Sequence, residues 1–138
     1  MGDDARIEVR TRCNPSEVDE RVSGAILALF PRSTISRNGI ELFGSGDDGS
    51  ALRAALDRHQ IRGAFSGRLH RSIRGTELLF TLSKQAAFMG VPSLGVGHPL
   101  GDLVVCVHVA DEDAAHRWVE WLTGGLPPLE IVVHASEE

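Results

Sequence analysis

The Asn38-Gly39 pair restricts the fold of this 138-residue chain more than any other short feature of its sequence. Residues 33–37 and 40–44, on either side of the pair, have the composition of strands. Asn-Gly accepts the positive φ angles of a type I′ turn, so we predict an antiparallel hairpin here. Any sheet that contains this hairpin must include antiparallel pairing.

Other segments also have the pattern of strands. These are residues 6–13, 77–82 and 103–109, and residues 129–133 could add a strand in the tail. In the first of them, apolar and charged residues alternate, which places Ile7, Val9 and Cys13 on the inner face.

The first helix is expected to begin at Ser16, because Ser is a good N-cap and acidic residues follow it. Pro31 ends this helix, since proline lacks a backbone donor and disfavours helical geometry at Phe30. Its inward stripe is Val18, Val22, Ala25, Ile26 and Leu29.

Further helices follow from apolar residues at helical spacing. They are a helix carrying Leu52, Ala55 and Leu56, a helix over 61–73 weakened by Gly63 and Gly67, a short turn or helix over 84–89, and an amphipathic helix over 111–122 with Ala114, Ala115, Trp118 and Leu122 inward. The order of elements lacks the alternation of a doubly wound fold. We therefore predict a single α+β domain over residues 1–138, with an antiparallel or mixed sheet and helices covering one face.

Charge is distributed unevenly along the chain. The net charge is −5, yet residues 1–90 carry +2 and residues 91–138 carry −7. Residues 58–84 concentrate the positive charge: Arg58, Arg62, Arg68, Arg71, Arg74 and Lys84 stand against the single acid Glu77. Guanidinium groups suit phosphate, so this region is the candidate for a polyanion partner.

Cys106 and His108 are two residues apart in a predicted strand and therefore share one face. Two ligands do not complete a metal site. Glu112 and His116 have helical i, i+4 spacing but lack the His-Glu-x-x-His pattern. We expect no metal and no cofactor.

Signals of an enzyme are also missing. Cys13 and Cys106 stand in apolar strands, where burial raises the pKa of a thiol, and no Gly-x-Ser-x-Gly turn occurs. The loop 44–50 lacks the ending of a Walker phosphate loop, and its two aspartates would repel phosphate. An enzyme would need a polar pocket near His98 and Asp102, and we expect none.

The sequence gives no indication of a membrane protein. No stretch approaches the roughly 20 apolar residues that span a bilayer, and the N-terminus lacks a basic segment followed by an apolar run. The two cysteines have no C-x-x-C spacing. We expect a cytoplasmic protein with reduced thiols and no membrane partner.

Several segments together resemble a small archaeal family of uncharacterised function that is commonly labelled RNA-binding. The resemblance rests on Asn14-Pro15-Ser16-Glu17, on Leu82-Ser83-Lys84-Gln85-Ala86-Ala87 followed by Gly90, on Pro99-Leu100-Gly101, and on Trp118-Val119-Glu120-Trp121-Leu122. It implies an α+β fold similar to the large-subunit ribosomal protein that contacts 5S rRNA, and a homodimer. The sequence departs from the family pattern at Val91-Pro92-Ser93-Leu94.

The leading hypothesis is a non-enzymatic, RNA-associated module. In it the six cations of residues 58–84 hold phosphates, and Gln85, carried over from the family pattern with Lys84, donates a hydrogen bond to sugar or base. The alternative is a homodimeric interaction or regulatory protein whose basic region faces an acidic surface of its partner subunit. Pairing of the arginines with Asp111, Glu112 or Glu120 would favour this alternative.

Overall fold

The computed structural model describes residues 5–95 and 101–124. Its centre is a six-stranded antiparallel sheet with the strand order β2-β3-β1-β6-β5-β4. The strands are β1 (Arg6–Arg12), β2 (Thr34–Asn38), β3 (Glu41–Gly46), β4 (Ile73–Arg74), β5 (Glu77–Ser83) and β6 (Asp102–His108).

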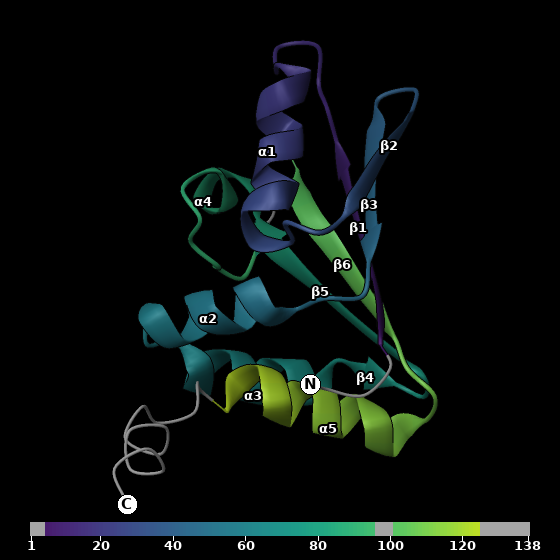
Figure 1. Ribbon diagram of the computed structural model, residues 1–138, viewed down its shortest axis with the longest axis vertical. Coiled ribbons are helices and arrows are strands. Elements are labelled where there is room, and N and C mark those ends of the chain that lie inside the picture. Colours follow the sequence, from purple (N-terminus) through teal and green to yellow (C-terminus); the bar gives the residue numbers. More distant parts are fainter. Residues whose placement is uncertain (1–4, 96–100, 125–138) are drawn as a thin grey trace, which may run out of the picture.

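Within the same residues, five helices pack against the sheet. They are α1 (Asp19–Leu29), α2 (Ser50–Arg58), α3 (Arg62–Arg71), α4 (Lys84–Phe88) and α5 (Glu112–Thr123). Helices α1 and α4 lie together in the upper half of the molecule, whereas α2, α3 and α5 form a group in the lower half (Figure 1). In the described ranges, no helix is both long and apolar enough to cross a membrane.

The two faces of the sheet differ in what covers them. In β6, Leu103, Val105 and Val107 are fully buried, whereas the intervening Val104 and Cys106 are only partly buried. The buried set joins the inner residues of the helices in one core. The helices therefore cover one face, and we call the other the open face. The predicted α+β class, with an antiparallel sheet and helices on one face, is confirmed.

The predicted hairpin is present, but its turn lies one residue later than expected. Asn38 pairs with Glu41, which makes Gly39 and Ile40 the two turn residues. Gly39 has φ +65°, while Ile40 has no positive φ. Glycine with positive φ at the first central position is the requirement of a type II′ turn, so the type I′ prediction was wrong in turn type and one residue off in position.

Helix α1 begins three residues after the predicted N-cap. Its N-cap is Val18, with no side-chain cap bond, and Val18 is 56% exposed instead of facing the core. Ser16 lies in a preceding turn in which the Glu17 amide donates to the Asn14 carbonyl at 2.8 Å. The side chain of Glu17 accepts from the Asn14 amide and its Nδ2, which keeps this segment out of the helix.

The predicted helix over 61–73 ends early. Helix α3 stops at Arg71, and Ile73–Arg74 forms β4, which pairs with Leu78 and Glu77 of β5. Gly75, with φ +62°, allows the tight reversal between these strands. Ile73 fits the apolar spacing of the predicted helix, but in the structure it is buried as part of strand β4. The loop part 98–100 and the tail strand 129–133 lie outside the described residues.

Candidate functional site

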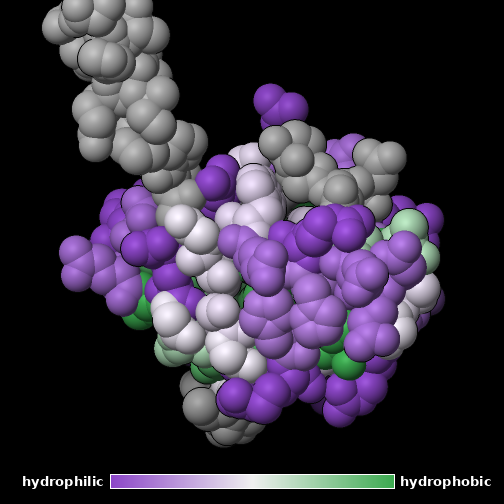
Figure 2. Space-filling view, turned by 90° about the horizontal axis from the view of Figure 1, so that it is seen from below, coloured by the Kyte–Doolittle hydropathy of each residue, from purple (hydrophilic) through white to green (hydrophobic). Residues whose placement is uncertain are grey.

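The arginines of the basic segment lie on consecutive elements in the lower half of the molecule. Arg58 is at the end of α2, Arg62, Arg68 and Arg71 are on α3, and Arg74 is on β4. All except the half-buried Arg62 are exposed. Seen from below, the face that includes α3 and α5 is covered largely by hydrophilic residues (Figure 2).

Carboxylates neutralise few of these arginines. Arg62 Nε lies 3.5 Å from Asp57 Oδ1, whereas Arg74 Nη1 donates to the carbonyls of Arg71 and Ile73 at 3.0 and 2.9 Å. In the described part of the chain, no carboxylate lies within ion-pair distance of Arg58, Arg68 or Arg71. The basic segment therefore keeps three exposed guanidinium groups free for a ligand.

Lys84 does not join the arginines. Its side chain is fully buried, and its ammonium donates to the Arg12 carbonyl at 2.7 Å and to Glu17 Oε1 at 3.1 Å. Burial of a charge is tolerated because both interactions compensate for lost hydration. A phosphate has no access to this ammonium, so the prediction that Lys84 holds phosphate does not fit its placement.

The Lys84–Glu17 pair makes stability depend on acid pH. Burial opposes ionisation of Glu17, but hydrogen bonds from Asn14 and Lys84 outweigh it and lower the pKa of this carboxyl. A lowered folded-state pKa adds stability above the pKa of the unfolded chain, and that stability is lost as pH falls through the folded value.

We therefore expect the urea midpoint to fall as the pH drops below about 5. At neutral pH, the Glu17→Gln variant should have a lower urea midpoint than the parent protein. Its midpoint should also fall less as the pH drops below about 5. The remaining acid dependence comes from Asp19 and Asp48, whose pKa values are also lowered. Parallel curves for the two proteins would contradict the assignment to Glu17.

Gln85 lies at the other end of the molecule. It is exposed on α4, beside α1 and away from α3 (Figure 1). There it lines a groove of about 190 Å³ together with Arg21, whose guanidinium lies 5.2 Å from the ring centroid of Phe88. The structure does not bring Gln85 together with the arginines of α3.

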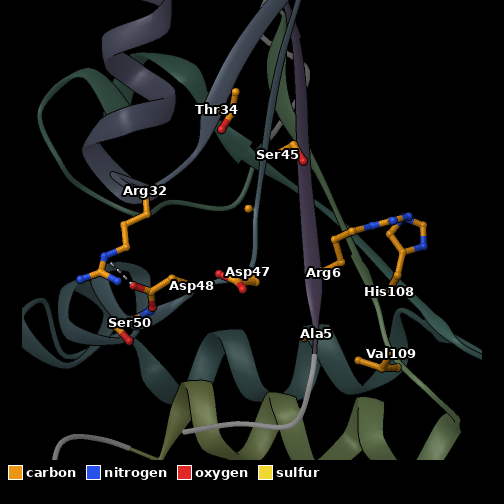
Figure 3. Close-up of a pocket in the computed structure, with 11 residues that line it drawn as sticks. Ala5, Arg6, Arg32, Thr34, Ser45, Asp47, Asp48, Ser50, His108 and Val109 are labelled. Carbon is orange, nitrogen blue, oxygen red and sulfur yellow. Dashed lines mark hydrogen bonds and ion pairs between the residues drawn. The ribbon is translucent and has the colours of Figure 1, made fainter.

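A broad polar hollow of about 1030 Å³ opens at the lower end of β1 and β3. Arg32 and Asp48 face each other on one side of it, 3.5 Å apart, and Arg6 and His108 lie across β1 (Figure 3). Hydrogen bonds from the Ser50 hydroxyl and amide, together with Arg32, lower the pKa of Asp48. The Asp48 carboxylate thus accepts the backbone N–H of Ser50, the first residue of α2, at 2.9 Å.

A compact polar cluster lies on the open face of the sheet. His108 stands between two carboxylates, with Nε2 3.1 Å from Glu8 Oε1 and Nδ1 3.5 Å from Glu77 Oε2. Ligand atoms of Glu77, Cys106 and His108 all lie within 4.8 Å of one another. Burial, with the charges of Glu77 and Glu8, raises the pKa of the Cys106 thiol.

Sequence reasoning found only half of this cluster. Cys106 and His108 share a strand face, as predicted, but Glu8 and Glu77 come from the neighbouring strands β1 and β5. The alternation of β1 shows that Glu8 points outward. The pairing register, which local sequence does not reveal, is what places both acids beside His108.

No family model matches the chain. Over 122 residues it is 28% identical to a UPF0201 protein from Methanothermobacter thermautotrophicus, a match that spans 85% of this chain and 89% of that protein. The crystal structure of a UPF0201 protein from Methanococcus jannaschii covers 88% of this chain and 95% of its own, with a TM-score of 0.79 at 19% identity. The chain is therefore similar to UPF0201 proteins over most of its length. The resemblance to a small archaeal family is thereby confirmed.

Other solved structures agree with this UPF0201 fold. A second UPF0201 crystal structure covers 76% of this chain and 83% of its own, with a TM-score of 0.72 at 23% identity. A DUF54 protein from Methanothermobacter thermautotrophicus covers 86% and 96%, with a TM-score of 0.61 at 18% identity. At these identities the structures establish that the UPF0201 fold is shared, and they assign no activity.

Proposed function

We propose that this protein is a non-enzymatic module that associates with RNA through the phosphate backbone. The observation that carries the proposal is the set of exposed arginines on α2 and α3, of which Arg58, Arg68 and Arg71 have no carboxylate partner in the described ranges. Guanidinium groups bind phosphate oxygens in a bidentate manner. Three of them on adjoining elements supply a phosphate-binding surface.

This surface positions a strand and does not read its sequence. Base recognition in single-stranded RNA depends on aromatic side chains on which bases stack. Phe65, the aromatic residue of α3, is 2% exposed and packs in the core. Phe88 lies at the other end of the molecule, beside Arg21. We therefore expect weak dependence on base composition.

The interface proposed here is smaller than the one that sequence alone predicts. Lys84 is excluded because its side chain is buried, and Gln85 because it lies on α4, which packs against α1. Arg62 is partly neutralised by Asp57, and Arg74 is engaged by backbone carbonyls. Arg58, Arg68 and Arg71 remain the principal contacts, with Arg74 as a fourth if its guanidinium turns toward the ligand.

Salt dependence of binding tests the proposal. If three or four arginines contact single-stranded phosphates, log affinity should fall against log salt concentration with a slope of about −2 to −3. The Arg68→Ala/Arg71→Ala variant should bind more weakly and show a slope shallower by about 1.4. Fluorescence anisotropy with a labelled single-stranded RNA at four salt concentrations measures both quantities.

A matched control removes the same charge elsewhere. Arg10 and Arg12 are exposed on β1, on the open face of the sheet, so Arg10→Ala/Arg12→Ala lowers the net charge by the same amount. This variant should keep the slope of the parent protein. Binding that does not change with salt, or an equal loss in both double variants, would rule out the arginines of α3 as the contact surface.

A second candidate is a homodimer held by charge. Asp111, Glu112, Asp113 and Glu120 of the α5 region are exposed, and none of them pairs with an arginine within residues 5–95 and 101–124. One protomer's α3 could face this acidic surface of another. Light scattering of the parent protein should then give a dimer mass at low salt that decreases at high salt and in Arg68→Ala/Arg71→Ala. A salt-independent mass leaves RNA as the partner of the arginines.

A further inference from the structure

The polar cluster on the open face brings together three kinds of metal ligand. His108 pairs directly with Glu77 across β5, and Cys106 pairs directly with Glu8 across β1. All four side chains point away from the core, because they occupy the outward positions of their strands. A carboxylate, a thiol and an imidazole therefore lie close together on one face of three paired strands, whose backbone is held rigid by the hydrogen bonds of the sheet.

The spacing of these atoms fits a tetrahedral ion. A zinc ion bound about 2.1 Å from a nitrogen and an oxygen holds those two atoms about 3.4 Å apart. His108 Nδ1 and Glu77 Oε2 are 3.5 Å apart. A sulfur ligand about 2.3 Å from the ion would lie about 3.6 Å from either atom. Ligand atoms of Cys106, His108 and Glu77 all lie within 4.8 Å of one another, so a small side-chain rotation brings the sulfur into place.

Glu8 contacts His108 but is not one of the proposed ligands. Its Oε1 lies 3.1 Å from His108 Nε2. An imidazole that binds a metal through one nitrogen usually donates its other N–H to a carboxylate or carbonyl, which orients the ring and selects the tautomer. Glu8 is placed to accept that N–H while Nδ1 faces Glu77.

We propose that Glu77, Cys106 and His108 bind a zinc ion on the open face of the sheet, with Glu8 as the residue that positions His108. Cys106 binds as the thiolate and releases its proton to solvent. The ion neutralises negative charge that the two carboxylates and the thiolate concentrate there. The sequence-based expectation of no metal weighed Cys106 with His108 but not the acids that the neighbouring strands add beside them.

Three protein ligands leave one position of a tetrahedral zinc ion open. Cys106 and His108 also line a groove of about 340 Å³, whose other walls include Phe43, Leu79 and Val104. The open position therefore adjoins a partly apolar groove, where water or a small ligand with an oxygen or sulfur donor completes the coordination. Mixed nitrogen, sulfur and oxygen ligands favour zinc or cobalt over magnesium or calcium.

Cobalt substitution tests the proposal directly. Titration of the purified, reduced protein with Co²⁺ should produce a sulfur-to-cobalt charge-transfer band in the near ultraviolet, together with the intense visible bands of a tetrahedral ion. Addition of Zn²⁺ should displace the cobalt and abolish both, whereas Mg²⁺ should leave them unchanged. An octahedral cobalt spectrum without a sulfur band would overturn the proposal.

The variants separate ligands from the positioning residue. Glu8→Gln should retain the cobalt spectrum and weaken zinc affinity about 10- to 100-fold. Cys106→Ala should abolish the sulfur band, and Cys106→Ala and His108→Ala should each weaken zinc binding more than Glu8→Gln does. Competition with a colorimetric chelator measures these affinities.

Two control variants remove the same residue types at positions away from the proposed site. His59→Ala removes an exposed imidazole at the end of α2, and Cys13→Ser removes the buried thiol on the core side of the sheet. Both should bind zinc as the parent protein does, with circular dichroism confirming that each is folded. Unchanged affinity in Cys106→Ala and His108→Ala would place any bound metal elsewhere and refute the site.

Discussion

Replacing Glu17 by alanine is expected to lower the free energy of unfolding by about 3–5 kcal/mol, because it leaves a buried ammonium without its counter-charge. Lys84 is fully buried, and once Glu17 is gone only the Arg12 carbonyl remains bound to its Nζ. The variant also loses the Glu17 hydrogen bonds to Asn14, which shape the turn before α1. Urea denaturation followed by circular dichroism measures the change.

The second variant distinguishes charge from packing. Glu17→Ala/Lys84→Met removes both members of the pair, and replacing a buried ion pair by apolar groups is often close to neutral. We expect the double variant to recover much of the loss seen in Glu17→Ala. The exposed Glu20, on the first turn of α1, is the control, and Glu20→Ala should change stability by no more than about 0.5 kcal/mol. A double variant that is less stable than Glu17→Ala would contradict the proposed role of the buried charge.

Phe65→Ala is expected to lower the free energy of unfolding by about 3–5 kcal/mol, as truncation of a buried aromatic residue usually does. Helix α3 depends on this side chain more than a typical helix would. It contains Gly63 and Gly67, each unfavourable by about 1 kcal/mol relative to alanine, and it has no side-chain N-cap. Only Phe65 and Leu69 of this helix are buried.

The same substitution connects stability to the proposed interface. Phe65→Ala removes no charge, yet it should weaken RNA binding because α3 carries Arg68 and Arg71. Phe43→Ala provides the comparison, since Phe43 is only partly buried on the open face and should lose much less stability. Urea denaturation and anisotropy on both variants give the two readouts. A loss below about 1 kcal/mol in Phe65→Ala would show that α3 does not depend on this contact.

Local sequence is informative where local physics decides the conformation. Alternation places Ile7, Val9 and Cys13 in the core, and the spacing of Ala114, Trp118 and Leu122 predicts the buried stripe of α5. The hairpin turn lies one residue later than the predicted Asn38-Gly39 turn, because Gly39 can adopt the positive φ that either a type I′ or a type II′ turn requires. Pairing of β3 with β1 and β2 then determines which register is used.

Errors at the site arise where distance along the chain differs from distance in space. Lys84 follows the arginines in the sequence, but β5 carries it across the molecule to Glu17, which is buried beside it. A count of charges along residues 58–84 contains no information about that contact. The same holds for Gln85, which α4 places next to α1.

The amino-acid order alone determined the α+β class, most element positions and the concentration of arginine on α2, α3 and β4, because these depend on residues within a few positions of each other. Tertiary structure decided which cations face solvent and which carboxylates stand beside His108. Strand register and helix packing set those relationships, and both are properties of the whole folded chain, in which segments such as β1 and β6 meet although about a hundred residues separate them.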